Sequence, residues 1–256
     1  MAGARKNNTR VIISGDIVEI VKSERYFKKR RDTKMDNNVK REPRQRTEAE
    51  LRARESYYRH KRVKDFVRTV NCNEKAWGEP IFITITFAEK ISIEDARTEF
   101  ANFIRRLNYK TFKTNTKKLK YSYSLEFQDR EVPHYHLIVY NCCYIEPEKK
   151  SKLWNLGTMD IEKVYDANRL AGYMTKDILD GDNRVELGHS QKMIKPTKLD
   201  AVDNTEEVLR VLKNVKTEKM INKYEHQNRY LGEMESVTYK VESDVLEERL
   251  DLFDMI

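Results

Sequence analysis

The sequence predicts an α+β fold built on an antiparallel sheet, and three observations support this prediction. Runs rich in β-branched and aromatic residues, typical of strands, cover 81–87, 121–128 and 134–141. Between the first two runs, apolar residues recur at helical spacing from Ser92 to about Tyr109. The second and third runs are separated only by a short polar stretch, which is typical of a hairpin.

The remaining elements follow in chain order. A short helix, a strand and a longer helix are expected at 147–154, 158–164 and 167–179. Asp166 or Asn168 can cap the last of these helices. The order is β-α-β-β-α-β with an added helix, which is the split β-α-β pattern of ferredoxin-like and RRM-like sheets. Such a sheet is expected to leave one face free for ligands.

Three regions are expected along the chain. Residues 1–77 form a basic, partly helical N-terminal extension, residues 78–200 the sheet domain, and residues 201–256 a helical C-terminal extension with an acidic tail. In the last region, we predict helices at 206–215 and 217–230, a strand at 236–241, and an amphipathic tail for a partner or for self-docking.

The composition excludes several classes of protein. Charged residues make up 36% of the 256 residues, and no apolar run approaches the ~18 residues of a membrane span. The N-terminus carries no export signal, and no Walker A sequence indicates a fused ATPase. The three cysteines are odd in number and lack metal-binding spacing, so a reducing, cytoplasmic location is expected.

Positive charge is concentrated near the N-terminus. Residues 22–68 hold 18 Lys/Arg against 8 Asp/Glu, and a capping box at 47–50 opens a helix that also carries Tyr57 and Tyr58. Basic side chains interleaved with aromatic residues suit a phosphate backbone and unstacked bases. The alternative is a solvated arm without a ligand. The candidate DNA-binding residues are Arg30, Arg31, Arg44, Arg46, Arg59, Lys61 and Arg62.

Two of the five histidines, His134 and His136, lie two residues apart in a strand-like run. Alternate residues of a strand point to one face, so both imidazoles share a face. If the preceding strand pairs with this one, Glu126 lies opposite His136 on that face, and Thr84 and Thr86 can share it. Two nitrogens and one carboxylate suit Mg²⁺ or Mn²⁺, although zinc accepts the same ligands. A structural pair of buried histidines is the alternative.

Tyr173 and Lys176 are three residues apart in the predicted 167–179 helix and so share a face. A phenol beside an ammonium is a nucleophile with a cationic partner that can hold phosphate. Such a pair is also common on ordinary surface helices. Combined with a metal that polarises a phosphodiester, however, it predicts cleavage through a covalent phosphotyrosine, which leaves a hydroxyl able to rejoin the strand.

The order of these motifs resembles the rolling-circle replication initiators of the HUH endonuclease superfamily, and within it the phage replication proteins of the filamentous-phage gene II type. The resemblance covers about 78–200. It is carried by these segments: Phe82–Phe87, Leu125-Glu126-Phe127-Gln128, His134-Tyr135-His136, Leu153-Trp154, Gly157–Ile161, Tyr173-Met174-Thr175-Lys176, and Gly188–Lys192 running to Lys195-Pro196.

The resemblance implies a role for each matching residue. His134 and His136 would bind the divalent metal with Glu126 as third ligand. Tyr173 would become linked to a 5′ phosphate of single-stranded origin DNA, near a hairpin, and Lys176 would assist. Several relatives carry a second tyrosine where this chain has Asp177, so a single-tyrosine enzyme is expected. The cytoplasm of a bacterial host, with its helicase or polymerase as partner, would be the setting.

Three other functions compete with this interpretation. A mobilisation relaxase or a transposase of the same superfamily would carry the same motifs. A non-catalytic, ferredoxin-like nucleic-acid-binding module would need stacking aromatic residues on the sheet face that instead carries His, Glu, Ser and Thr. A small zinc hydrolase would leave Tyr173 without a purpose.

Overall fold

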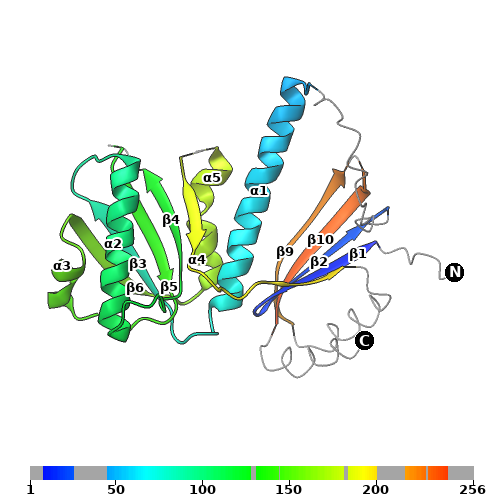
Figure 1. Ribbon diagram of the computed structural model, residues 1–256. Coiled ribbons are helices and arrows are strands. Elements are labelled where there is room, and N and C mark those ends of the chain that lie inside the picture. Colours follow the sequence, from blue (N-terminus) through cyan, green and yellow to red (C-terminus); the bar gives the residue numbers. More distant parts are fainter. Residues whose placement is uncertain are drawn as a thin grey trace, which may run out of the picture. The chain divides into compact units, whose positions relative to one another are not determined.

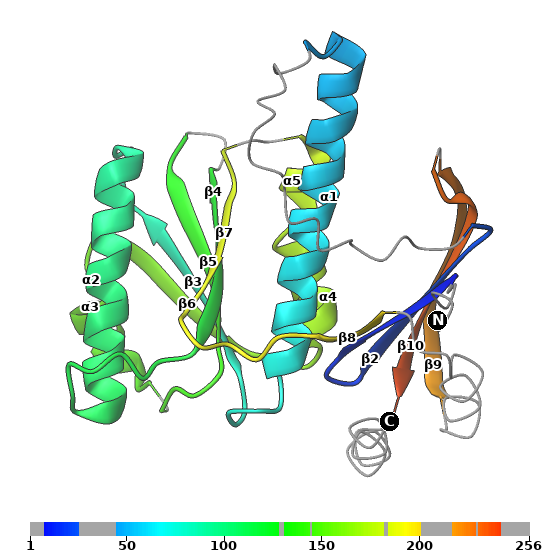
Figure 2. The ribbon, with the colours of Figure 1, turned by 45° about the vertical axis from the view of Figure 1, so that its right-hand side comes forward.

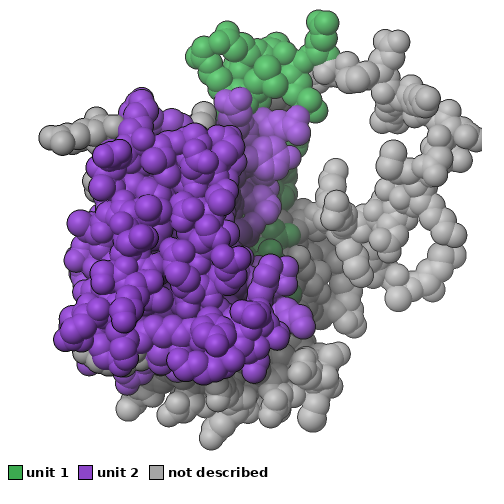
Figure 3. Space-filling model, turned by 60° about the vertical axis from the view of Figure 1, so that its left-hand side comes forward, with its two compact units in different colours: residues 1–53, 196–256 green, residues 54–195 purple. Residues whose placement is uncertain are grey.

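The computed structural model describes residues 8–25, 45–127, 131–143, 145–181, 184–200, 217–228 and 230–241. This part of the chain is α+β, with two five-stranded antiparallel sheets (Figure 1). The chain divides into two compact units, one formed by residues 1–53 and 196–256 and the other by residues 54–195 (Figure 3). Each unit contains one sheet.

The larger unit, residues 54–195, contains the strands predicted from the sequence. Its sheet has the order β6-β3-β5-β4-β7. The strands are β3 (Ile81–Phe87), β4 (Tyr121–Phe127), β5 (Pro133–Val139), β6 (Gly157–Lys163) and β7 (Glu186–His189). The helices are α2 (Ile93–Phe112), a 3₁₀ turn (Pro147–Lys149), α3 (Lys150–Leu153), α4 (Ala167–Tyr173), α5 (Lys176–Asp180) and most of α1 (Glu48–Asn73).

Helix α2 covers one face of this sheet, as Figures 1 and 2 show. Ser92 caps the helix by accepting a hydrogen bond from the Asp95 backbone N–H. Its apolar residues pack on the inward-facing side chains of β3, β4 and β5, and Phe100 stacks on Tyr135 with ring centroids 4.2 Å apart. The alternation of the strands therefore predicted this buried face correctly.

Helices α1 and α4 cover the opposite face, which the sequence predicted to be free. Phe66 of α1 and Met174, just after α4, belong to a second core that also contains Phe82, Ile138 and Tyr140 of the sheet. The prediction of a free face was wrong because α1, which was assigned to an N-terminal arm, turns an apolar stripe to the sheet. The predicted capping box of α1 is present at Thr47–Glu50.

The helix predicted at 167–179 is broken in two. Asp166 caps α4 by accepting a hydrogen bond from the Arg169 backbone N–H. Thr175 leaves helical geometry (φ −117°, ψ 0°), and its hydroxyl donates to the backbone carbonyls of Ala171 and Gly172. A hydroxyl that bonds to the preceding turn competes with the helical ladder, and α5 begins immediately afterwards.

The smaller unit differs more from expectation. Its strands are β1 (Thr9–Ser14), β2 (Ile17–Ser23), β8 (Thr197–Asp200), β9 (Thr217–Asn228) and β10 (Gly232–Val241), in the order β8-β1-β2-β10-β9. The helix predicted at 217–230 was wrong, because 217–228 pairs with β10 along its length. The strand predicted at 236–241 is confirmed as part of β10. The helix predicted at 206–215 and the acidic tail lie outside the described residues.

The predicted extensions are therefore not purely helical, because residues 9–23 form the β1–β2 hairpin at one end of the chain and 217–241 a second hairpin at the other. Among the helices that the structure describes, none combines the length and apolar character needed to cross a membrane.

Candidate active site

His134 and His136 lie side by side on β5 and point to the face covered by α1 and α4. The neighbouring strand β3 places a threonine opposite each of them. The Thr86 hydroxyl lies 2.5 Å from Nδ1 of His134, and the Thr84 hydroxyl lies 3.2 Å from Nδ1 of His136. Both Nδ1 atoms are thus engaged. The Nε2 atoms are therefore the ones through which this pair can bind a further group.

Glu126 of β4 reaches the same site from the other side of β5. It pairs in register with His134, and Ser124 pairs with His136, so the predicted pairing of Glu126 with His136 is displaced by two residues. The displacement keeps Glu126 on the predicted face because side chains alternate with a period of two. Its Oε2 still lies 3.6 Å from Nε2 of His136, and Ser124 donates to its Oε1 at 3.0 Å.

The three side chains are buried. Exposed fractions are 7% for His134, 6% for His136 and 7% for Glu126. Burial, and secondarily the positive charge of a protonated His136, lowers the pKa of His134 to about 4, while Glu126 and Asp160 act in the opposite direction. His134 is therefore neutral at pH 7, the state in which an imidazole can ligate a metal.

As the structure stands, the described residues contain no group of three or more His, Cys, Asp or Glu side chains that is already arranged to hold a metal ion. The donor chemistry nevertheless fits a divalent cation: two imidazoles oriented through Nδ1, with one carboxylate facing the Nε2 atom of His136. The three cysteines are unpaired thiols.

Tyr173 and Lys176 approach the histidines from α4 and α5. The Tyr173 ring lies edge-on to His136, with ring centroids 5.7 Å apart and an interplanar angle of 73°. The Lys176 ammonium lies 4.7 Å from the centroid of the Tyr173 ring. Tyr173 is 48% exposed. The structure thus brings together the two motifs that are separated by 37 residues or more in the sequence.

A cavity of about 530 Å³ opens beside this cluster. His136 and Tyr173 both line it, together with Lys163 and Arg169 as cations and Tyr165, which is 90% exposed. The cavity therefore joins an imidazole, a phenol, positive charge and an exposed aromatic ring. These are the groups that a phosphodiester and its adjoining base require.

Residues 80–181 match the family model of the replication-associated proteins of the ORF2 type. No curated protein and no solved structure matches the chain. The match includes Glu126, the histidine pair, Tyr173 and Lys176, and so contains the whole candidate site. Similarity to this replication-associated family supports a role as a replication initiator and is compatible with an endonuclease role.

Of the predicted DNA-binding residues, three lie on α1 within the larger unit, but outside the segment that matches the family model. Arg59 is partly buried. Lys61 pairs with Asp65 at 2.5 Å, and Arg62 donates to the Val185 carbonyl at 3.2 Å. Arg46 precedes α1 and is exposed. Arg30, Arg31 and Arg44, like the weaker metal-ligand candidate Gln128, lie outside the described residues.

Two residues of the matched segment were missed at the sequence level. Asp160 of β6 pairs with Thr84, which in turn pairs with His136, so the three share one row across the sheet. Arg169 precedes Tyr173 by one helical turn and lines the same cavity. The i, i+4 spacing of Arg169 and Tyr173 was a usable signal. The position of Asp160 depended on strand order, which the sequence leaves open.

Proposed function

We propose that this chain is a metal-assisted endonuclease that nicks single-stranded origin DNA through Tyr173 and initiates rolling-circle replication of a phage or plasmid. The observation that carries the proposal is the meeting of Tyr173, Lys176 and His136 beside one cavity. The similarity to the replication-associated family supports the link to replication.

The topology supports an HUH-type core. Within the larger sheet, the strands β6-β3-β5-β4 connect in the chain order β-α-β-β-α-β, which is the ferredoxin-like arrangement. The non-catalytic alternative would need an open sheet face for stacking bases. Helices α1 and α4 cover that face, so a strand of DNA reaches the histidines through the cavity beside Tyr173.

In the proposed reaction, the Tyr173 oxygen attacks phosphorus as its phenolic proton is lost to solvent. The bond from phosphorus to the 3′ oxygen breaks, that oxygen takes up a proton, and the 5′ phosphate stays on Tyr173. Lys176 and Arg169 hold negative charge on the phosphate. His134, His136 and Glu126 would hold a divalent metal, Mg²⁺ or Mn²⁺, which supplies Lewis-acid polarisation of the phosphodiester when bound.

The test uses the full chain, Mn²⁺ and a pool of single-stranded stem–loop oligonucleotides with randomised loops, labelled at the 3′ end. A denaturing gel should show a labelled protein–DNA adduct, which Tyr173→Phe and chelator abolish. Tyr165→Phe is the matched control, because Tyr165 is an exposed tyrosine of the same cavity, and it should keep the adduct. An adduct that persists in Tyr173→Phe would exclude this nucleophile.

The metal site is tested separately. His134→Ala and His136→Ala should remove cleavage while salt-sensitive DNA binding remains, with circular dichroism to verify that each variant is folded. Cleavage at the wild-type rate in both variants would contradict a role for the histidines in the metal site.

A further inference from the structure

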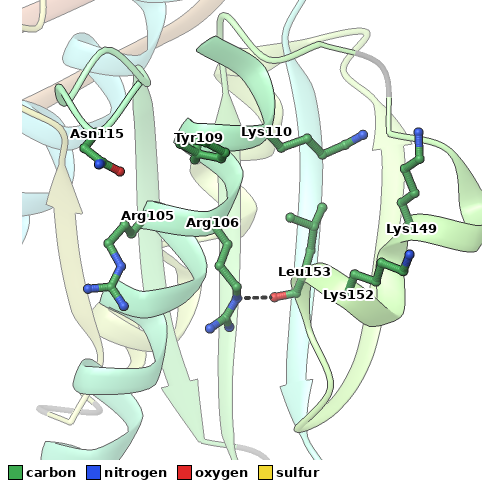
Figure 4. Close-up of a pocket in the computed structure, with 8 residues that line it drawn as sticks. All are labelled: Arg105, Arg106, Tyr109, Lys110, Asn115, Lys149, Lys152 and Leu153. Atoms are coloured by element: carbon green, nitrogen blue, oxygen red, sulfur yellow. Dashed lines mark hydrogen bonds between the residues drawn. The ribbon is translucent and has the colours of Figure 1, made fainter. Parts of the chain in front are cut away.

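A second cavity, of about 400 Å³, lies where α2 meets α3, on the side of the sheet opposite the histidines (Figure 4). Positively charged side chains dominate its wall, and none of the described residues that line it is acidic. Its cations are Arg105, Arg106, Lys110, Lys149 and Lys152. The cavity is therefore a concentrated positive region that the proposed cleavage chemistry does not use.

Two of these cations are neutralised from outside the wall. Glu146 accepts hydrogen bonds from Lys110 at 2.8 Å and from Lys149 at 3.0 Å. The hydrogen bond from Lys110 is the largest cause that lowers the pKa of Glu146 to about 2. This carboxylate leaves three cations, Arg105, Arg106 and Lys152, to meet a ligand's negative charge.

Arg106 is held in a fixed position with a donor unused. Its Nε donates to the Leu153 carbonyl at 2.9 Å, the bond drawn in Figure 4. Its Nη2 is buried and has no hydrogen-bond partner among the described residues. A buried donor without an acceptor costs about 1–3 kcal/mol, so a ligand oxygen that reaches this guanidinium has an unusually favourable partner.

An aromatic ring completes the site. Tyr109 lies on α2 between the arginines and Lys110, lines the cavity and is 53% exposed. An exposed ring beside fixed cations provides a surface for a base next to a bound phosphate. An acidic peptide would use the same cations but would leave this ring without a function, so the wall favours a nucleotide unit.

We propose that this α2–α3 cavity is a second binding site for single-stranded nucleic acid, which holds one phosphate on Arg105, Arg106 and Lys152 and stacks the adjoining base on Tyr109. A volume of about 400 Å³ lies within the ~300–1,000 Å³ of typical ligand sites and accommodates one nucleotide. The proposal does not depend on the cleavage reaction, because the cavity shares no residue with the candidate active site.

The first experiment measures binding of a fluorescent oligothymidylate to the full chain, in chelator, across a salt series. Arg105→Gln/Lys152→Gln should weaken binding and reduce the slope of log K against log salt by about 1.4, for two phosphate contacts on a single strand. Tyr109→Leu should weaken binding about tenfold. The matched control is Lys90→Gln/Arg97→Gln, which removes two cations paired with Glu131 and Glu186 outside the cavity. It should change both quantities much less.

The second experiment locates the contact. An oligonucleotide containing 5-iododeoxyuridine is photocrosslinked to the protein, and the modified peptides are mapped by mass spectrometry. The Tyr109 peptide should be labelled in the wild type and in the Lys90/Arg97 control, and lose its label in Arg105→Gln/Lys152→Gln. Equal binding losses in the cavity and control variants would overturn the proposal. So would absence of label at Tyr109, or equally strong, cavity-dependent binding of a polyglutamate peptide.

Discussion

Replacing Tyr135 by Phe should stabilise the protein, whereas replacing Tyr140 by Phe should destabilise it. Both tyrosines belong to β5 or directly follow it, and both are buried. The Tyr135 hydroxyl has no hydrogen-bond partner among the described residues, whereas the Tyr140 hydroxyl lies 2.8 Å from the Ser122 hydroxyl. The two substitutions remove the same atom and so differ only in what that atom contacts.

The expected magnitudes follow from these contacts. An unsatisfied buried polar group costs about 1–3 kcal/mol, and Tyr135→Phe removes it while the ring stays stacked on Phe100. Tyr140→Phe loses one hydrogen bond with a net value of about 0.5–1.5 kcal/mol. The free energies of unfolding should therefore differ by about 2–4 kcal/mol between the variants.

Urea unfolding followed by tryptophan fluorescence measures this difference, because Trp154 is buried beside Phe87 in the same core. The measurement requires equal m-values, so that the shift in midpoint reports stability. Equal destabilisation by both substitutions would refute the reasoning, since the hydroxyl of Tyr135 would then have to make a stabilising contact.

Further predictions concern two glycines and one histidine. A Cβ at Gly157 would overlap the Thr86 backbone carbonyl, so Gly157→Ala should cost several kcal/mol of unfolding free energy, whereas Gly172→Ala meets open space within α4 and should stabilise by about 0.5–1 kcal/mol; thermal unfolding of both variants checks the contrast. Burial, and then the charge of Lys195, lowers the pKa of His189 to about 4, so the unfolded chain takes up the proton first as pH falls from 6.5. Stability should be full above pH 6.5 and fall by at most about 3 kcal/mol toward pH 4, and His189→Gln should flatten this part of the profile. An unchanged profile in that variant would contradict the assignment.

The candidate site was predictable where it depended on alternation along a strand. The parity of His134, His136 and Glu126 followed from the sequence and placed all three on one face. The register did not follow, because pairing begins at Phe127 and Pro133, and the connection between strands sets that start. The pairing of Thr84 and Thr86 with the histidines likewise required the order of the strands.

The fold was least predictable in the smaller unit. Residues 217–228 are rich in Lys, Glu, Asn and Met, which favour helix or turn over strand, yet they form β9 because β10 supplies a hydrogen-bonding partner along its whole length. The β1–β2 hairpin was missed despite a usable signal. Two β-branched runs flank Gly15, whose positive φ of 58° suits the turn.

The covered sheet face changes how the proposed active site must operate. A sheet open to solvent would let DNA lie across both histidines, but these imidazoles are 6–7% exposed, and α1 and α4 occupy the approach. The nucleophile is carried by one of the covering helices and is 48% exposed at the cavity mouth. The scissile phosphate therefore has to enter between Tyr173 and His136, so a bulky side chain introduced at Gly172 or Arg169 should block cleavage without disturbing the buried imidazoles.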